Sequence, residues 1–159
     1  MNVEYLNPFI KSTVNALSTM ACLEPSRGNP YLRKTGQKIE CDISGTIGVA
    51  GEASGSVTVS FSESVARKIV ENMLGIQVDS LNDDVKDAVG EIANMIAGGA
   101  KGELSEKGYS FKIALPVVCI GKDHYTEYPK DIPCVVIPFS VEEGAFYVEI
   151  CLKVDDNGK

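Results

Sequence analysis

Three polar residues of this chain, Asp87, Glu91 and Asn94, are spaced so that they could act together on one partner. Side chains three or four positions apart share a face of an α-helix, so a helix here would present two carboxylates and an amide on one side. A carboxylate can pair with a cation, and an amide can both donate and accept hydrogen bonds, for example to water. The same spacing also occurs on ordinary solvated helix faces.

The apolar residues of this stretch recur at helical spacing and predict how the helix is held. Asn82 or Asp83 is its expected N-cap, and Gly108 its expected end. Gly98, on the polar face, and Gly99 each cost about 1 kcal/mol relative to alanine, so a close approach to the backbone or a bend is expected there. The apolar side chains form one narrow stripe that should face the core: Val85, Val89, Ile92, Ile96, Ala100 and Leu104.

Patterns elsewhere predict two further helices and a strand-rich remainder. Residues 3–23 show helical periodicity, and Ser62 or Glu63 can cap a second helix that ends near residue 74. Residues 26–36 lack any period and predict an exposed connector, while Gly45 predicts a turn between strands. Short alternating runs predict strands at residues 38–44, 46–50, 55–61, 109–115, 117–121, 134–141 and 145–154.

A helix followed by strands occurs twice along the chain, which suggests a faint internal repeat. Ser12 and Asn15 of the first helix correspond in it to Glu91 and Asn94, so the first copy lacks the carboxylate. A chain of 159 residues has the length of one domain, which buries about 70% of its unfolded surface. We therefore expect a single α+β domain over residues 1–159, with a largely antiparallel sheet covered by long helices.

The pattern Asp87-x-x-x-Glu91-x-x-Asn94, followed by small and apolar residues, resembles the active-site helix of the CheC/CheX/FliY family of bacterial chemotaxis phosphatases. The run Asn7-Pro8-Phe9-Ile10 and the helical pattern after it resemble the opening helix of the CheX branch. The strand-rich remainder fits that branch in order and length. The resemblance therefore spans essentially the whole chain, and the single intact motif favours the branch with one active site.

This resemblance implies a phosphatase that removes the aspartyl phosphate of a CheY-like response regulator. Asn94 would position the attacking water, since in-line phosphoryl transfer depends on positioning and electrostatics. The resemblance also implies that Glu91 pairs with a lysine of the regulator and that Asp87 supports the site. The small residues Gly90, Ala97 and Gly98 would let the helix enter the regulator's cleft.

The same resemblance makes predictions about partners and cofactors. It implies a homodimer, and it places the required Mg²⁺ in the partner regulator, so no cofactor of the chain's own is expected. The main alternative is a non-catalytic module that binds a phosphorylated response regulator or a flagellar switch component.

Charge and hydropathy restrict the classes of partner. The formal net charge is −7 and the pI is about 4.7, which argue against binding to nucleic acid or to an anionic membrane. No signal-peptide pattern and no run of about 18 apolar residues occurs. We expect a cytoplasmic protein that does not associate with membranes.

Other residues with chemical potential give weaker patterns. Asp123 and His124 lie in a polar stretch without a serine-nucleophile context, so His124 is expected in an exposed loop. The glycines match neither the P-loop nor the dinucleotide-binding spacing. No CxxC pair occurs, so we expect no metal site, and the cysteines are expected to be buried, reduced thiols: Cys22, Cys41, Cys119, Cys134 and Cys151.

Overall fold

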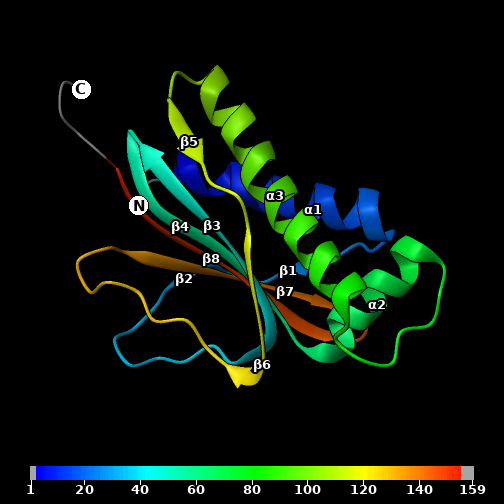
Figure 1. Ribbon diagram of the computed structural model, residues 1–159. Helices are drawn as coiled ribbons and strands as arrows, with labels where there is room; N and C mark the ends of the chain where they lie inside the picture. The colour runs from blue at the N-terminus through cyan, green and yellow to red at the C-terminus, as the bar shows by residue number, and fades with distance from the viewer. Residues whose placement is uncertain (1–2, 155–159) are drawn as a thin grey trace.

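Three helices lie on one face of an eight-stranded sheet in the computed structural model, which describes residues 3–154 (Figure 1). No helix in this range is long and apolar enough to cross a lipid bilayer. The elements are α1 (Val3–Ala21), β1 (Ser26–Arg27), β2 (Tyr31–Leu32), β3 (Cys41–Gly51), β4 (Ala53–Phe61), α2 (Glu63–Leu74), α3 (Asp83–Glu106), β5 (Phe111–Ile113), β6 (Val117–His124), β7 (Cys134–Val141) and β8 (Gly144–Val154).

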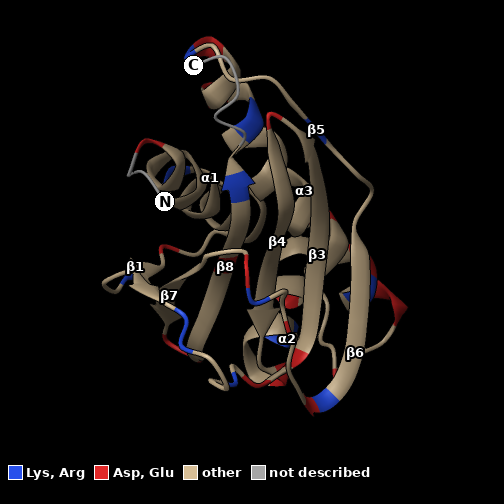
Figure 2. Cartoon of the chain, turned by 90° about the vertical axis from the view of Figure 1, so that its left-hand side faces the viewer, with Lys and Arg blue, Asp and Glu red and all other residues tan. Residues whose placement is uncertain are grey.

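The strands pair in the order β1-β7-β8-β4-β3-β5, and β2 also pairs with β7 while β6 pairs with β3. Every recorded pairing is antiparallel. β6 lies at one edge of the sheet and β1 at the other, with α2 and α3 behind the strands (Figure 2). The expected α+β class and antiparallel sheet are therefore confirmed.

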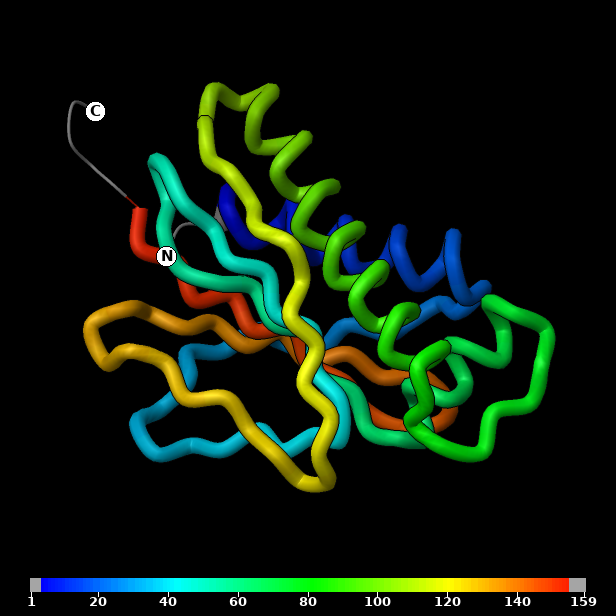
Figure 3. Tube along the Cα trace, viewed as in Figure 1, coloured from blue at the N-terminus to red at the C-terminus, as the bar shows by residue number. Residues whose placement is uncertain are grey.

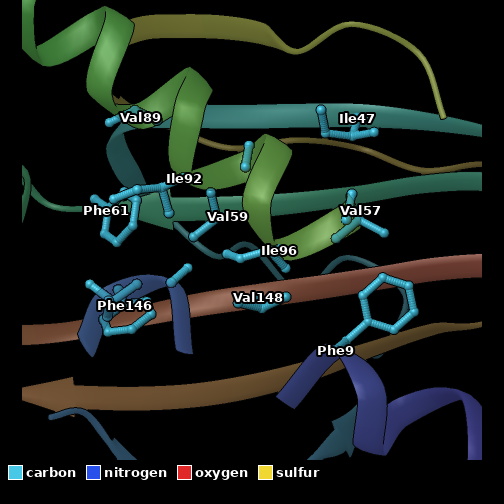
Figure 4. Close-up of a cluster of buried hydrophobic side chains, with 14 of the residues drawn as sticks. Phe9, Ile47, Val57, Val59, Phe61, Val89, Ile92, Ile96, Phe146 and Val148 are labelled. Carbon is cyan, nitrogen blue, oxygen red and sulfur yellow. The ribbon is translucent and has the colours of Figure 1, made fainter. Parts of the chain in front are cut away.

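The hydrophobic core lies between the helices and the sheet face that they cover (Figure 4). From the sheet, Phe61 and Phe146 meet with ring centroids 5.2 Å apart, and Phe139 stacks on Phe146 at 5.1 Å. The predicted stripe of α3 supplies the opposite wall, since all six of its residues are buried: Val85, Val89, Ile92, Ile96, Ala100 and Leu104. The period of apolar residues thus identified the inner face of α3 correctly.

Gly45 does not form the predicted turn, because β3 continues through it from Cys41 to Gly51. A Cβ atom at this position would lie 3.1 Å from the Cβ of Ala93 and 3.3 Å from Cγ1 of Val89. The glycine therefore lets α3 pack directly on β3, a use of glycine inside a strand that a turn-based interpretation misses.

A second close approach joins α1 to α3 and explains one of the two helical glycines. The Ser12 hydroxyl lies 3.0 Å from the carbonyl oxygen of Met95 and 2.8 Å from that of Ile96. A Cβ on Gly99 would collide with this hydroxyl, whereas one on Gly98 would meet nothing within 4 Å. Ser12 is thus buried at a helix crossing, while Glu91, its counterpart in the faint repeat, is exposed.

These contacts predict opposite effects for two neighbouring substitutions. Gly98→Ala should raise the free energy of unfolding by up to about 1 kcal/mol, because alanine is the better helix former and meets no atom. Gly99→Ala should lower it by about 1 kcal/mol, because the new methyl group displaces the Ser12 hydroxyl from its acceptors. Urea titration of both variants tests this. Adding Ser12→Ala to Gly99→Ala should recover part of the lost free energy of unfolding. No recovery would contradict the proposed clash between the new methyl group and the Ser12 hydroxyl.

Two segments expected to be loops contain regular structure. The connector at residues 26–36 holds β1 and β2, which pair with β7. β6 extends to His124, whose ring is half-buried with Nε2 2.9 Å from the Ser44 hydroxyl, so the prediction of an exposed loop histidine is wrong. Pairing of β6 with β3 places these two residues together across about eighty positions of sequence, which local patterns do not reveal.

The expectation of buried, reduced cysteines is correct only for Cys41. Cys134 of β7 and Cys151 of β8 form a disulfide, with their Cα atoms 4.1 Å apart. The two residues are direct partners in the β7–β8 register, which sequence spacing did not specify. Cys22 and Cys119 are free but exposed.

A buried polar group lies on the sheet face opposite the helices. Glu149 of β8 is only 1% exposed, and its carboxylate accepts a hydrogen bond from Arg33 at 3.0 Å. The Tyr128 hydroxyl donates to Thr58 at 2.9 Å, and the guanidinium of Arg33 lies over the Tyr128 ring. Burial raises the pKa of Glu149 to about 7, and the neighbouring Arg33 only partly opposes this rise.

This raised pKa predicts that stability falls as pH rises from about 4.5 to about 7. The folded state holds a proton on Glu149 that the unfolded chain, with a pKa of 4.5, has already released. Between pH 5.5 and 8 the free energy of unfolding should therefore fall by about 2 kcal/mol more in the parent than in Glu149→Gln. Urea titrations at the two pH values measure this difference, with exposed Glu127→Gln as control. Equal pH dependence in the parent and Glu149→Gln would refute it.

Candidate functional site

The outer face of α3 carries the candidate site, and local sequence explains where this helix begins. The Asn82 side chain caps it by accepting a hydrogen bond from the backbone N–H of Val85 at 3.1 Å. Asp83 and Asp84 occupy the first turn, where the helix dipole favours negative charge. With the apolar stripe fixed against the sheet, the polar positions must face outward.

A surface hollow of about 280 Å³ lies between α3 and the chain that enters β6. Asp87, Glu91 and Asn94 all line it, so the structure brings these three predicted residues together. Gly98 is one turn farther along α3 and does not line the hollow. The hollow is lined by Lys86, Asp87, Gly90, Glu91, Asn94, Pro116 and Val118.

The wall opposite the carboxylates is apolar and depends on a glycine. Gly90 is buried, and a Cβ there would lie 3.4 Å from Cγ2 of Val118 and 3.7 Å from Cγ of Pro116. Val118 is the β6 partner of Gly45 in β3, the residue on which α3 packs. One long-range strand pairing therefore places both the helix and the far wall of the hollow.

Sequence reasoning missed three lining residues, namely Lys86, Pro116 and Val118. Lys86 precedes Asp87 and could have been included by its position at the edge of the polar face. Nothing local indicated Pro116 or Val118, because their relation to α3 depends on the pairing of β6 with β3.

The polar groups of the hollow are available to a partner. Glu91 is exposed and Asn94 is half-buried. Within residues 3–154, neither side chain makes a hydrogen bond or an ion pair. A carboxylate and an amide without internal partners, next to an apolar wall, can bind a cation and orient a water molecule on one incoming surface.

Other clusters offer less access to a substrate. Ser44 and His124 are close enough to hydrogen-bond, but Ser44 is 2% exposed, and the adjacent Asp123 is tied through its backbone N–H to Asp42. Among residues 3–154, no group of three or more His, Cys, Asp or Glu side chains is arranged to hold a metal ion.

Comparison with known proteins agrees with the fold. The family model described as Chemotaxis phosphatase CheX matches residues 43–140. The CheY-P phosphatase CheX of Thermotoga maritima is 32% identical over 126 residues, which cover 77% of this chain and 79% of that protein.

Solved structures extend this similarity to nearly the full length. The chemotaxis protein CheX from Vibrio vulnificus has a TM-score of 0.90 and 41% identity, covering 94% of this chain and 99% of that one. A chain of the CheX–CheY–BeF₃–Mg²⁺ complex from Borrelia burgdorferi shares the fold, with a TM-score of 0.78, 24% identity and coverage of 94% and 97%. The helix that carries Glu91 and Asn94 lies within the matched region, and the chain belongs to the CheX family of chemotaxis phosphatases.

Proposed function

We propose that this protein hydrolyses the aspartyl phosphate of a CheY-like response regulator. The observation that carries the proposal is the pair of side chains, Glu91 and Asn94, which lie in one hollow without partners among residues 3–154. The name of the Thermotoga maritima relative, a CheY-P phosphatase, supports the same activity.

Asn94 is the proposed catalytic residue. Its amide oxygen accepts a hydrogen bond from the attacking water and its amide nitrogen can donate to a phosphoryl oxygen, so the water is held in line with the breaking P–O bond. The water adds to phosphorus, the bond to the aspartate oxygen breaks, and inorganic phosphate and a free carboxylate result. An amide suits this role better than a carboxylate, whose charge would repel the phosphoryl oxygens.

Glu91 is the proposed docking residue. It lies one turn before Asn94, and its exposed carboxylate can form a charge-assisted hydrogen bond with a lysine of the regulator. Asp87 lies one turn earlier still and supports the same contact. Gly98 leaves space beside α3 for the regulator, since nothing lies within 4 Å of a Cβ built there. We assign the required Mg²⁺ to the regulator and no cofactor to this chain.

We also propose a homodimer joined at the free edge of β6. β6 has eight residues and pairs only with β3 among residues 3–154, so its other edge has unpaired backbone groups. Val117 at its start is 69% exposed. Sedimentation equilibrium should give twice the monomer mass, and Val117→Glu should shift the equilibrium toward the monomer. A parent protein that stays monomeric would refute this interface.

The alternative is a module that binds the phosphorylated regulator, or a flagellar switch component, without catalysis. The availability of Glu91 and Asn94 is compatible with binding alone. The two functions differ in what Asn94→Ala does, because a binding module keeps its affinity and has no turnover to lose.

Single-turnover loss of phosphate from a phosphorylated CheY-type receiver tests the proposal. The parent protein should accelerate it, Asn94→Ala should abolish the acceleration, and Glu91→Ala should weaken binding of the receiver. Binding of the BeF₃ form of the receiver, measured in parallel, separates a failure of docking from a failure of chemistry. Tight binding without acceleration by the parent protein would establish the binding module.

A further inference from the structure

A second and larger hollow lies on the sheet face opposite α3. Its volume is about 510 Å³, within the range of small-molecule sites. Two loops form its walls, residues 33–38 after β2 and residues 125–133 between β6 and β7. The two loops lie side by side, far from α3, in the Cα trace (Figure 3).

Both walls are fixed to the sheet by partly buried side chains. Arg33 donates to the carbonyl oxygen of Gln37 through Nε at 3.1 Å and Nη2 at 2.9 Å, and to Glu149 through Nη1. The first loop is therefore closed on itself and tied to β8. The second loop is tied to β4 by the hydrogen bond from Tyr128 to Thr58. The hollow is thus preformed, which lowers the entropic cost of binding a ligand.

The charge of this hollow is opposite to that of the whole chain. The chain has 22 acidic and 15 basic residues, yet Glu127 is the one acidic residue in the lining, against four basic ones: Arg33, Lys34, Lys38 and Lys130. The Arg33 guanidinium is already bonded to Glu149 and to the Gln37 carbonyl oxygen. The three lysines form no ion pair with any residue in the described range 3–154. Their charge is available to an anion.

The rest of the lining is apolar or aromatic. Leu32 is 62% exposed at one end, and Ile132 and Pro133 lie on the opposite loop. The Lys38 ammonium lies 4.8 Å from the centre of the Tyr125 ring, so a cation and an aromatic face adjoin each other. A ligand that fills this hollow would contact both kinds of surface at once.

We propose that this hollow binds a small organic anion with an apolar or aromatic body and one phosphate, sulfonate or carboxylate group. The anionic group binds to Lys34 and Lys130, and the body packs on Leu32, Ile132 and the Tyr125 ring. This site is separate from the hollow on α3 and does not depend on the phosphatase activity.

Anilinonaphthalene sulfonate, a fluorescent aromatic anion, is a direct probe of this chemistry. Its fluorescence should rise with saturation at one molecule per chain. Phenylnaphthylamine, the same body without the sulfonate, should bind at least about tenfold more weakly. Equal affinity for the two probes would overturn the proposal, because the lysines would then have no role.

Charge reversal locates the probe on the chain. The double variant Lys34→Glu with Lys130→Glu should lower affinity for the sulfonate probe at least about tenfold. The matched control, Lys101→Glu with Lys153→Glu, changes the net charge equally but lies outside this hollow and should retain the parent affinity. Equal losses in both double variants would show a general charge effect and refute the site. Asn94→Ala should bind the probe like the parent, which keeps this test independent of the phosphatase proposal.

Discussion

Replacing Asn94 by alanine is expected to lower the single-turnover rate of phosphate loss from the phosphorylated regulator by about 100-fold or more. Removing one positioned hydrogen-bonding group that acts in a transition state typically costs a factor of about 10² to 10³. The fold should be unaffected, because Asn94 is on the outer face of α3 and makes no hydrogen bond within residues 3–154. The expected change in the free energy of unfolding is below about 0.5 kcal/mol.

Rapid-quench measurement of phosphate release, combined with urea unfolding of the same variant, checks both parts of this expectation. Asn15→Ala is the matched control, since Asn15 is an exposed asparagine on α1 at the corresponding position of the faint repeat. This control should keep the parent rate. Glu91→Ala should instead raise the regulator concentration needed for half-maximal rate. An Asn94→Ala protein with the parent rate would remove Asn94 from the mechanism.

Replacing Ile92 by alanine is expected to lower the free energy of unfolding by about 2 to 5 kcal/mol. Ile92 lies between Glu91 and Asn94 in sequence but points the other way, and it is fully buried against the sheet (Figure 4). Truncation removes apolar contacts and leaves a cavity that the surrounding strands can only partly fill. Substitutions on the outer face of α3 should therefore change the free energy of unfolding little, whereas substitutions on its inner face should lower it.

Chemical denaturation of Ile92→Ala, with Ile120→Ala as matched control, measures this contrast. Ile120 is about two-fifths exposed, at 43%, so the same truncation should cost far less there. Similar losses in the two variants would mean that α3 does not pack on the sheet as described.

The inner and outer faces of α3 were predictable from the sequence, because the spacing at which apolar residues recur is a local property. A long helix repeats this spacing many times. Val89 and Ile96 are buried and Glu91 is exposed as that period requires. The cap at Asn82 was predictable for the same reason, since its side chain accepts from a backbone N–H only three residues away and depends on no distant contact.

Features that depend on strand register were not predictable. Gly45 has the sequence context of a turn, and its pairing with Val59 of β4 and Val118 of β6 shows that it lies inside a strand. The apolar wall formed by Pro116 and Val118 likewise depends on the pairing of β6 with β3. The disulfide between Cys134 and Cys151 depends on the β7–β8 register, which a spacing of 17 residues leaves open.

The position of β8 in the sheet has a consequence for how the chain reaches its native state. β8 is the last described strand, yet it lies between β4 and β7, paired with both along most of its length. A ribosome-bound chain that ends before residue 144 leaves β4 without one neighbour, and the centre of the sheet incomplete. Native pairing of β4 with β8 must therefore wait until residues 144–154 have been synthesised, and because this pairing joins distant parts of the chain it should be slow. Amide protons of β8 should accordingly exchange with solvent only when the whole molecule opens.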